Sequence, residues 1–119
     1  MLVGVREATP VTYMGRRMLP KGLSMAIGSE QRRRERKPRV EELFTSQQVE
    51  AALDLLHLMD MAWHDCYGPR ELEVPPAVLD DVLLLADGDL AVLINVAREA
   101  VIDFRDVRIA ADAKRAKSK

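Results

Sequence analysis

The stretch VEAALDLLHLMDMAWHDCYGP, residues 49–69, carries the apolar spacing that predicts the first long helix of the fold. Its apolar side chains return every three or four positions, which places them on one face of an α-helix. That face carries Val49, Ala52, Leu56, Met59 and Trp63. We predict a helix over residues 46–66, with a capping box at residues 45–48 (TSQQ) before it and Gly68 and Pro69 after it.

Two further helices are predicted after short links. Prolines suit a first helical turn, so we predict a second helix over residues 76–86 that stops at Gly88. Asp89 then caps a third helix that runs from residue 90 to about residue 113. No strand pattern competes with these helices. The predicted fold is therefore all-α, a small antiparallel three-helix bundle.

The N-terminal part of the chain lacks such periodicity. Gly or Pro recurs at short intervals in residues 1–37, and a nearly all-charged run ends this segment. We predict a disordered basic arm over residues 1–37, a helical domain over residues 38–113 and a basic tail over residues 114–119. The domain would begin with a short leading helical turn, PRVEELF, at residues 38–44.

Charge is divided unevenly along the chain, although the net charge is only −1. Residues 1–40 carry ten Lys/Arg and three Glu, a net of +7. Residues 41–113 carry four Arg and sixteen Asp/Glu, a net of −12, and the last six residues add +4. This division of charge predicts that the arginine-rich arm lies transiently against the acidic body of its own chain or against that of a dimer mate.

Composition excludes several classes of protein. A chain of 119 residues makes one domain, and with 48% hydrophobic but only 4% aromatic residues its core is aliphatic. The single cysteine excludes an internal disulfide and fits a reducing compartment. No apolar run approaches the roughly 20 residues that span a bilayer, and the N-terminus is a poor signal peptide. We expect a cytoplasmic protein, and thirteen Arg against five Lys favour a GC-rich, bacterial coding sequence.

Cys66 and His64 are the first candidates for catalysis. Cys66 falls on the same helix side as Trp63, whereas His64 lies about 160° away from it at 3.6 residues per turn. A nucleophile and its base must come within hydrogen-bond reach, and these two side chains would face apart. We therefore interpret Cys66 as a small core residue, and we expect no catalytic residue and no enzyme activity.

His57, Asp60 and His64 line one edge of the same helix and include metal-binding residue types. The two histidines are separated by roughly 10 Å along the helix axis. Zinc ligands lie about 2 Å from the metal, so one ion can hardly reach both. We interpret the three residues as Asp–His pairs that border the core, and we expect no metal and no cofactor.

Four residues are candidate partner contacts. Leu58 and Met61 fall on the otherwise polar side of the first helix, and Leu84 falls outside the apolar arc of the second. This excess of apolar surface indicates a homodimer or another protein partner, unless the arm or the leading turn covers it. Arg108 lies on the apolar face of the third helix, where it would contact a partner or anion, or pair with Asp112.

The arginine-rich segment is the candidate for nucleic-acid or anion contact. Its basic residues are Arg32, Arg33, Arg34, Arg36, Lys37 and Arg39. They could bind phosphate backbones, but no aromatic residue accompanies them and the acidic body opposes the approach of DNA. We therefore expect a non-catalytic interaction or regulatory module. The alternative is a nucleic-acid-associated accessory protein that is tethered by the basic arm.

Overall fold

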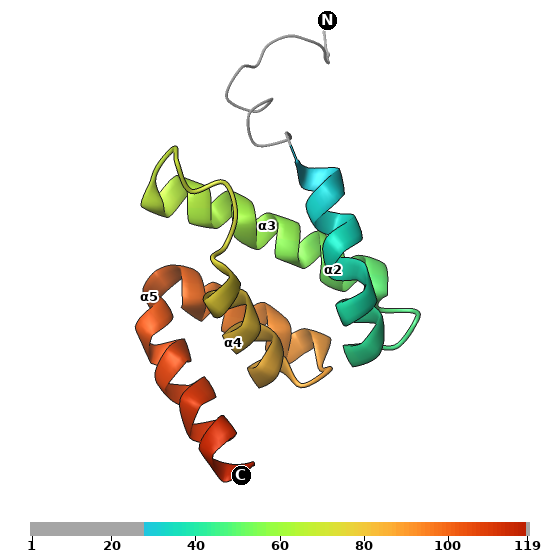
Figure 1. Cartoon of the computed structure of the whole chain (residues 1–119), viewed down its shortest axis with the longest axis vertical. Helices are drawn as coiled ribbons and strands as arrows, with labels where there is room; N and C mark the ends of the chain where they lie inside the picture. Colours follow the sequence, from blue (N-terminus) through green and yellow to red (C-terminus); the bar gives the residue numbers. More distant parts are fainter. Residues whose placement is uncertain (1–27, 119) are drawn as a thin grey trace, which may run out of the picture. The chain divides into compact units, whose positions relative to one another are not determined.

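The computed structural model describes residues 28–118, which contain four helices and no strand (Figure 1). The helices are α2 (Ser29–Leu43), α3 (Val49–Tyr67), α4 (Pro76–Ala86) and α5 (Leu90–Lys117). The predicted all-α class is confirmed. The described chain from Arg32 onward forms one compact unit, and the contacts described below lie within it. No helix of the described range is long and apolar enough to cross a membrane.

Helix α4 has the predicted bounds, because local signals set both of its ends. Pro76 occupies the first turn, and the left-handed conformation of Asp87 (φ 51°) ends the helix. Gly88 follows with φ 80°, and a Cβ atom there would lie 2.5 Å from the carbonyl oxygen of Leu43. Only glycine therefore lets the end of α2 approach this turn. Asp89 caps α5 as predicted, since its Oδ1 accepts the N–H of Val92 at 3.1 Å.

Helix α3 begins three residues later than predicted. Residues 46–48 form a turn in which the N–H of Gln48 donates to the carbonyl of Thr45 at 2.9 Å. Gln48 is the N-cap residue and makes no side-chain capping bond, so the predicted capping box is wrong. The predicted end is confirmed, because the N–H of Gly68 donates to the carbonyl of His64 at 3.0 Å.

Helix α2 corrects the prediction of a basic arm that is disordered as far as residue 37. The helix begins at Ser29 and continues through Pro38, so the prediction is wrong for residues 29–37. Residues 1–27 lie outside the described residues. Val40 and Phe44 anchor the end of this segment in the aliphatic core. Tertiary contacts, rather than an apolar pattern within the segment, hold the charged part of the helix.

Helix α5 is kinked at Asp103, whose φ of −155° and ψ of 95° lie outside the helical region. Oδ1 of Asp103 accepts the N–H of Arg105 at 3.1 Å, so Asp103 caps the segment after the kink. The hydroxyl of Tyr67 donates to the carbonyl of Val101 at 2.9 Å, which satisfies a carbonyl at the break. We call residues 104–117 the distal half of α5. This half is helical to Lys117, so the predicted separate tail begins too early.

The core is aliphatic, as the composition predicted. Its largest fully buried apolar side chains are Leu53, Leu56, Leu83, Leu93, Val40, Val74 and Val82. Trp63 and Phe44 are the two aromatic side chains among the buried residues of the described chain. The ring of Trp63 lies 4.2 Å from that of Tyr67 and 5.8 Å from that of Phe104, measured between centroids. These rings connect the end of α3 to the kink in α5.

Candidate functional site

The predicted polar edge of α3 is covered by the link to α4. The imidazole Nδ1 of His64 lies 3.1 Å from the carbonyl oxygen of Glu71, and Nε1 of Trp63 donates to the Glu71 carboxylate at 3.1 Å. His64 is consequently buried, although we predicted that it borders the core. Cys66 is exposed, so its assignment to the core is wrong. The buried residues of α3 end at His64, and the last turn lies beyond them.

Asp60 is the centre of the most buried charged cluster in the described chain. Its two carboxylate oxygens accept hydrogen bonds from the two terminal nitrogens of Arg36, at 2.8 and 3.0 Å. Oδ1 also accepts the N–H of Val74 at 2.9 Å, and Nε of Arg32 lies 3.4 Å from Oδ2. We call Asp60, Arg32, Arg36 and the N–H of Val74 the Asp60 cluster. It joins α2, α3 and the link that enters α4 around one fully buried carboxylate.

The Asp60 cluster also affects whether the side chains on this edge of α3 could hold a metal ion. Asp60 could have been a metal ligand together with one of the two histidines, but its oxygens accept hydrogen bonds from Arg36 and from the backbone N–H of Val74. Among residues 28–118, no group of three or more His, Cys, Asp or Glu side chains is arranged to hold a metal ion.

Most of the candidate nucleic-acid contacts bind the protein's own carboxylates. Arg33 donates to Asp54 at 2.7 Å and to Glu50 at 2.5 Å. The bond to Glu50, followed by that to Asp54, raises the pKa of the Arg33 guanidinium above its usual value. Arg39 reaches Asp80 of α4 at 2.6 Å.

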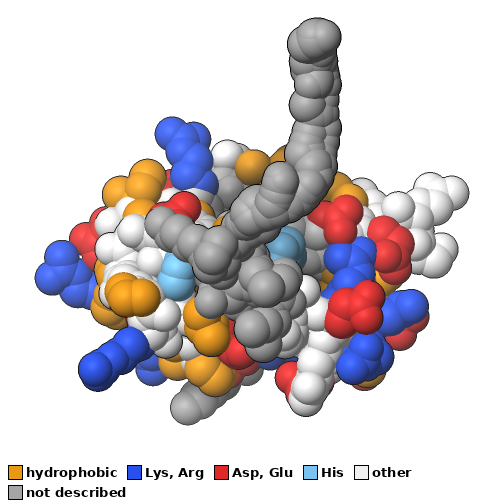
Figure 2. All heavy atoms as spheres, turned by 90° about the horizontal axis from the view of Figure 1, so that it is seen from above, with side chains coloured by type: hydrophobic (Ala, Val, Ile, Leu, Met, Phe, Trp, Pro, Cys, Tyr) orange, Lys and Arg blue, Asp and Glu red, His pale blue; other side chains and the backbone are white. Residues whose placement is uncertain are grey.

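Arg32 and Arg36 belong to the Asp60 cluster, whereas Arg34 and Lys37 are exposed. Figure 2 shows basic and acidic side chains next to one another on one side of the described surface. The arginines of α2 therefore act largely as intramolecular ties.

A second buried carboxylate, Asp81 of α4, holds the distal half of α5. Arg115 donates to its Oδ1 at 2.7 Å, and Nε of Arg108 lies 3.7 Å from its Oδ2. The bond to Asp81, with a further bond to Asp112, raises the pKa of Arg115. We call Asp81, Arg108 and Arg115 the Asp81 cluster. Arg108 thus faces Asp81, whereas Asp112 pairs with Arg115 at 2.9 Å.

The predicted partner contacts Met61 and Leu84 differ in their surroundings. Met61 is exposed, as expected from its place on the outer side of α3. Leu84 is half-buried, and its carbonyl oxygen accepts the Nζ of Lys114 at 2.8 Å. The distal half of α5 therefore lies beside Leu84, which weakens the case for Leu84 as a contact with another protein.

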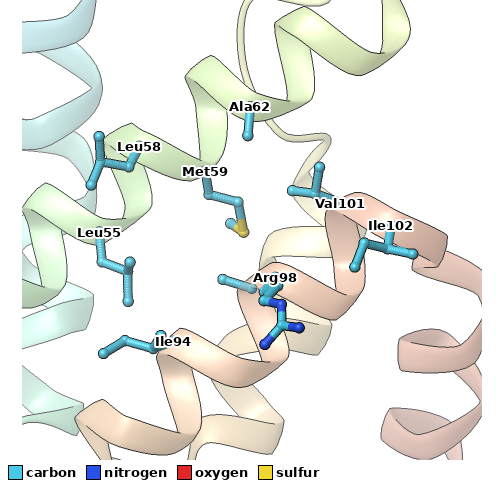
Figure 3. Close-up of a pocket in the computed structure, with 9 residues that line it drawn as sticks. Leu55, Leu58, Met59, Ala62, Ile94, Arg98, Val101 and Ile102 are labelled. Atoms are coloured by element: carbon cyan, nitrogen blue, oxygen red, sulfur yellow. The ribbon is translucent and has the colours of Figure 1, made fainter.

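Leu58 lies on a groove between α3 and α5, which we call the α3–α5 groove (Figure 3). The groove has a volume of about 330 Å³. Its lining is Leu55, Leu58, Met59, Ala62, Ile94, Ala97, Arg98, Val101 and Ile102. Leu58, Ile94 and Ile102 remain 58%, 49% and 72% exposed.

Sequence reasoning found only one wall of this groove. It identified Leu58 on α3, but Ile94, Arg98 and Ile102 of α5 were not among its candidate partner contacts. Ile102 lies about 100° around the helix from Val101 and outside the core face, and an isoleucine at such a position was the available signal. Arg98 is the one charged residue of the lining.

The described buried carboxylates and the buried histidine are engaged within the protein. Asp60 and Asp81 are each held by arginines, so neither carboxylate is placed as a free general base. The His64 ring is occupied by a backbone carbonyl. The α3–α5 groove, by contrast, presents aliphatic side chains to solvent. No family model matches this sequence, and no curated protein or solved structure is significantly similar to it.

Proposed function

We propose that the protein is a non-catalytic interaction module that binds a protein partner in the α3–α5 groove. The observation that carries the proposal is the clustering of three largely exposed aliphatic side chains, Leu58, Ile94 and Ile102, around one groove. Burial of apolar surface releases about 25 cal/mol per Å², so a partner that covers these side chains gains affinity. Exposed apolar clusters of this kind mark interaction sites.

The remaining architecture supports this role as a scaffold. In this proposal α3, α4 and α5 form the three-helix bundle expected from the sequence, and α2 is tied to it through the Asp60 cluster. Both walls of the groove belong to helices, which hold binding residues more firmly than loops do. A bacterial cytoplasmic location remains part of the proposal, and it rests on the composition and the single cysteine.

The nucleic-acid alternative has weaker support. Arg32, Arg33, Arg36 and Arg39 each have a carboxylate partner within the protein, and a phosphate would have to displace that partner. Retention of the full chain on DNA at low salt tests the alternative directly. Loss of retention in the double variant Arg34→Glu/Lys37→Glu, with the fold intact by circular dichroism, would favour it over the proposal.

Site-specific photocrosslinking in the cells that produce the protein tests the proposal. A photoreactive residue is placed at Ile102 in the groove, or at Ile109 as a matched control. Both are exposed isoleucines of α5, at 72% and 68%, but only Ile102 lines the groove. We expect a protein adduct from position 102 that position 109 does not give. The absence of a protein adduct at position 102, or the same adducts at both positions, would refute the proposal.

A further inference from the structure

We propose that two copies of this chain exchange the distal half of α5, with the kink at Asp103 as the hinge. In the exchanged dimer α5 is straight, and its distal half lies on α4 of the other copy. This inference goes beyond the proposed function, because the α3–α5 groove is lined by α3 and by the part of α5 before the kink. It is carried by the hydrogen bonds at the kink and by the contacts of the distal half.

The hydrogen bonds at the kink are those of a helix that is opened at one position. In a continuous α-helix the N–H of Arg105 would donate to the carbonyl of Val101, but the non-helical backbone of Asp103 lies between them. Oδ1 of Asp103 accepts the N–H of Arg105 at 3.1 Å. The hydroxyl of Tyr67 donates to the carbonyl of Val101 at 2.9 Å. The two groups that a straight helix would join are therefore each bonded to a side chain.

The sequence of α5 does not itself require a kink. Sharp kinks usually occur at proline, at Gly/Ser pairs or where a side chain inserts into the helical hydrogen bonds, and residues 90–117 contain no proline, glycine or serine. Residues 104–117 include four alanines and five Lys or Arg, which are good helix formers. A straight α5 is therefore a second conformation of the same helix, and the side chains of Asp103 and Tyr67 select the kinked one.

Asp103 also sets the balance between the two conformations through its charge. In the kinked helix its carboxylate pairs with Nε of Arg105 at 3.0 Å. In a straight helix it would lie on the same side as Glu99 and Asp106, four residues before it and three residues after it. Like charges at these spacings repel one another. A chain without this carboxylate should therefore straighten α5 more readily.

The contacts of the distal half are ones that a second copy supplies unchanged. Val107 and Ala111 are buried, and Val107 belongs to the hydrophobic core. Arg108 and Arg115 face the buried Asp81 of α4. When α5 straightens, all of these groups lose their partners together and α4 is uncovered around Asp81. The distal half of another copy offers this face the same apolar residues and the same two cations.

The geometry and charge of α4 favour exactly this replacement. Figure 1 shows the distal half turning back beside α4 after the kink, where Nζ of Lys114 donates to the carbonyl of Leu84 at 2.8 Å. Asp81 is only 1% exposed, so its carboxylate needs a cation once α5 has straightened. Exchange keeps each contact and changes only the chain that supplies it. The dimer therefore differs from two monomers mainly at the kink and in the entropy of association.

Variants at the kink test the proposal on the full chain. Tyr67→Phe keeps the ring but removes the donor to the Val101 carbonyl, and Asp103→Ala removes the cap; we call this double substitution the hinge variant. Sedimentation velocity over a range of protein concentrations measures the association constant of the dimer. We expect the hinge variant to raise this constant by about tenfold or more over the parent chain. Asp106→Ala removes the same charge from the same helix but leaves the cap, so this matched control should change it by less than about threefold.

A mixture of two charge variants tests whether the distal half is the segment that is exchanged. One chain carries Asp81→Lys, and the other carries Arg108→Asp and Arg115→Asp. Within either chain alone, α4 and the distal half then present like charges to each other. In a reciprocal dimer both contacts join opposite charges, so we expect a heterodimer when the two chains are mixed. A single chain with all three substitutions is the matched control, and it should sediment as the parent chain does.

Each contrary outcome overturns a stated part of the argument. An equal association constant in the hinge variant and the parent chain would overturn the exchange, whether or not the charge variants fold. If the control with three substitutions is helical by circular dichroism, a mixture that forms no heterodimer would overturn it as well. A dimer of the hinge variant that Ile102→Asp dissociates and Ile109→Asp does not would place the contact in the α3–α5 groove instead. Whether another protein occupies that groove is decided separately, by the crosslinking experiment.

Discussion

The Asp60 and Asp81 clusters place the same groups in two different surroundings. Each has a fully buried aspartate that is reached by two arginines. The arginine side chains of the Asp60 cluster are both 10% exposed, whereas those of the Asp81 cluster are 51% and 39% exposed. The comparison teaches that burial of the cation, more than the pairing itself, decides what a broken ion pair costs.

The two clusters also differ in what they hold. Asp60 accepts the backbone N–H of Val74 in addition to Arg36, so it fixes the position of α2 and of the chain entering α4. Asp81 holds only the distal half of α5, which lies beyond the kink at Asp103. Loss of the first cluster should disturb the whole unit, and loss of the second should disturb one segment.

The largest expected effect is that of Asp60→Asn. The substitution keeps the size of the side chain but leaves the buried guanidinium of Arg36 without the carboxylate that it pairs with. Removing one partner of a buried ion pair costs about 3–5 kcal/mol, which is a large part of the stability of a small domain. Urea unfolding followed by circular dichroism measures the loss. A change below about 1 kcal/mol would show that the cluster is not the tie described here.

Asp81→Asn should have a smaller and more local effect. Hydrogen bonds to a charged group contribute about 1.5–3 kcal/mol, and here water can reach the arginines left behind. Amides of residues 104–117 should exchange faster with deuterium, while amides of α3 keep their protection. Hydrogen-exchange mass spectrometry tests this, with Asp60→Asn as the comparison. Amide exchange that becomes faster to the same extent in all helices would show that the two clusters do not differ in this way.

The cap at Asp103 sharpens the comparison further, because it acts on the distal half without touching Asp81. Hydrogen bonds from the side chain and then the backbone N–H of Arg105 lower the pKa of Asp103. The ionised carboxylate of Asp103 therefore contributes fully to stability above its ordinary pKa of about 3.9, and this contribution is lost as the pH falls through its lowered pKa. Asp103→Ala should speed exchange in residues 104–117 at neutral pH, whereas Asp103→Asn, which can still cap, should do so less. Equal exchange in both variants would argue against the cap.

Arg33→Ala should have the smallest effect. Arg33 reaches Glu50 and Asp54, but all three side chains are substantially exposed. Exposed ion pairs contribute about 0–1 kcal/mol and are screened by salt. The difference in melting temperature between the variant and the parent protein should therefore be small at 0.1 M salt and smaller still at 1 M salt. A destabilisation as large as that of Asp60→Asn would contradict the rule drawn from the two clusters.

The sequence predicted the elements whose signals are local. Pro76 and Gly88 enclose α4, and its predicted bounds agree with the structure. Helix α2 lacked such a signal, because its partners lie far along the chain. Arg36 pairs with Asp60 across 24 residues, and no periodicity within α2 encodes that contact. Its charges instead resembled those of a disordered segment.

The candidate site was predicted in part for the same reason. The polar side of α3 made Leu58 conspicuous, so one wall of the groove was found. Ile94 fits the helical stripe of α5, but α3 does not cover it fully, and only the packing of the helices decides this. Cys66 and His64 exchanged their expected environments because the link between α3 and α4 folds over the polar edge of α3. A helical wheel contains no information about such a link.

The kink at Asp103 has a mechanical consequence. A force applied at the C-terminus first loads the Arg115–Asp81 contact and then the Arg108–Asp81 contact. It reaches the hydrogen bond of Tyr67 at the kink only after the distal half has peeled away. These contacts are loaded one after another along the helix and break one at a time, whereas the contacts around Asp60 bear a load together. A pull on this end of the chain therefore has to break the contacts of Asp81 and expose the buried Val107 and Ala111 before it loads the kink.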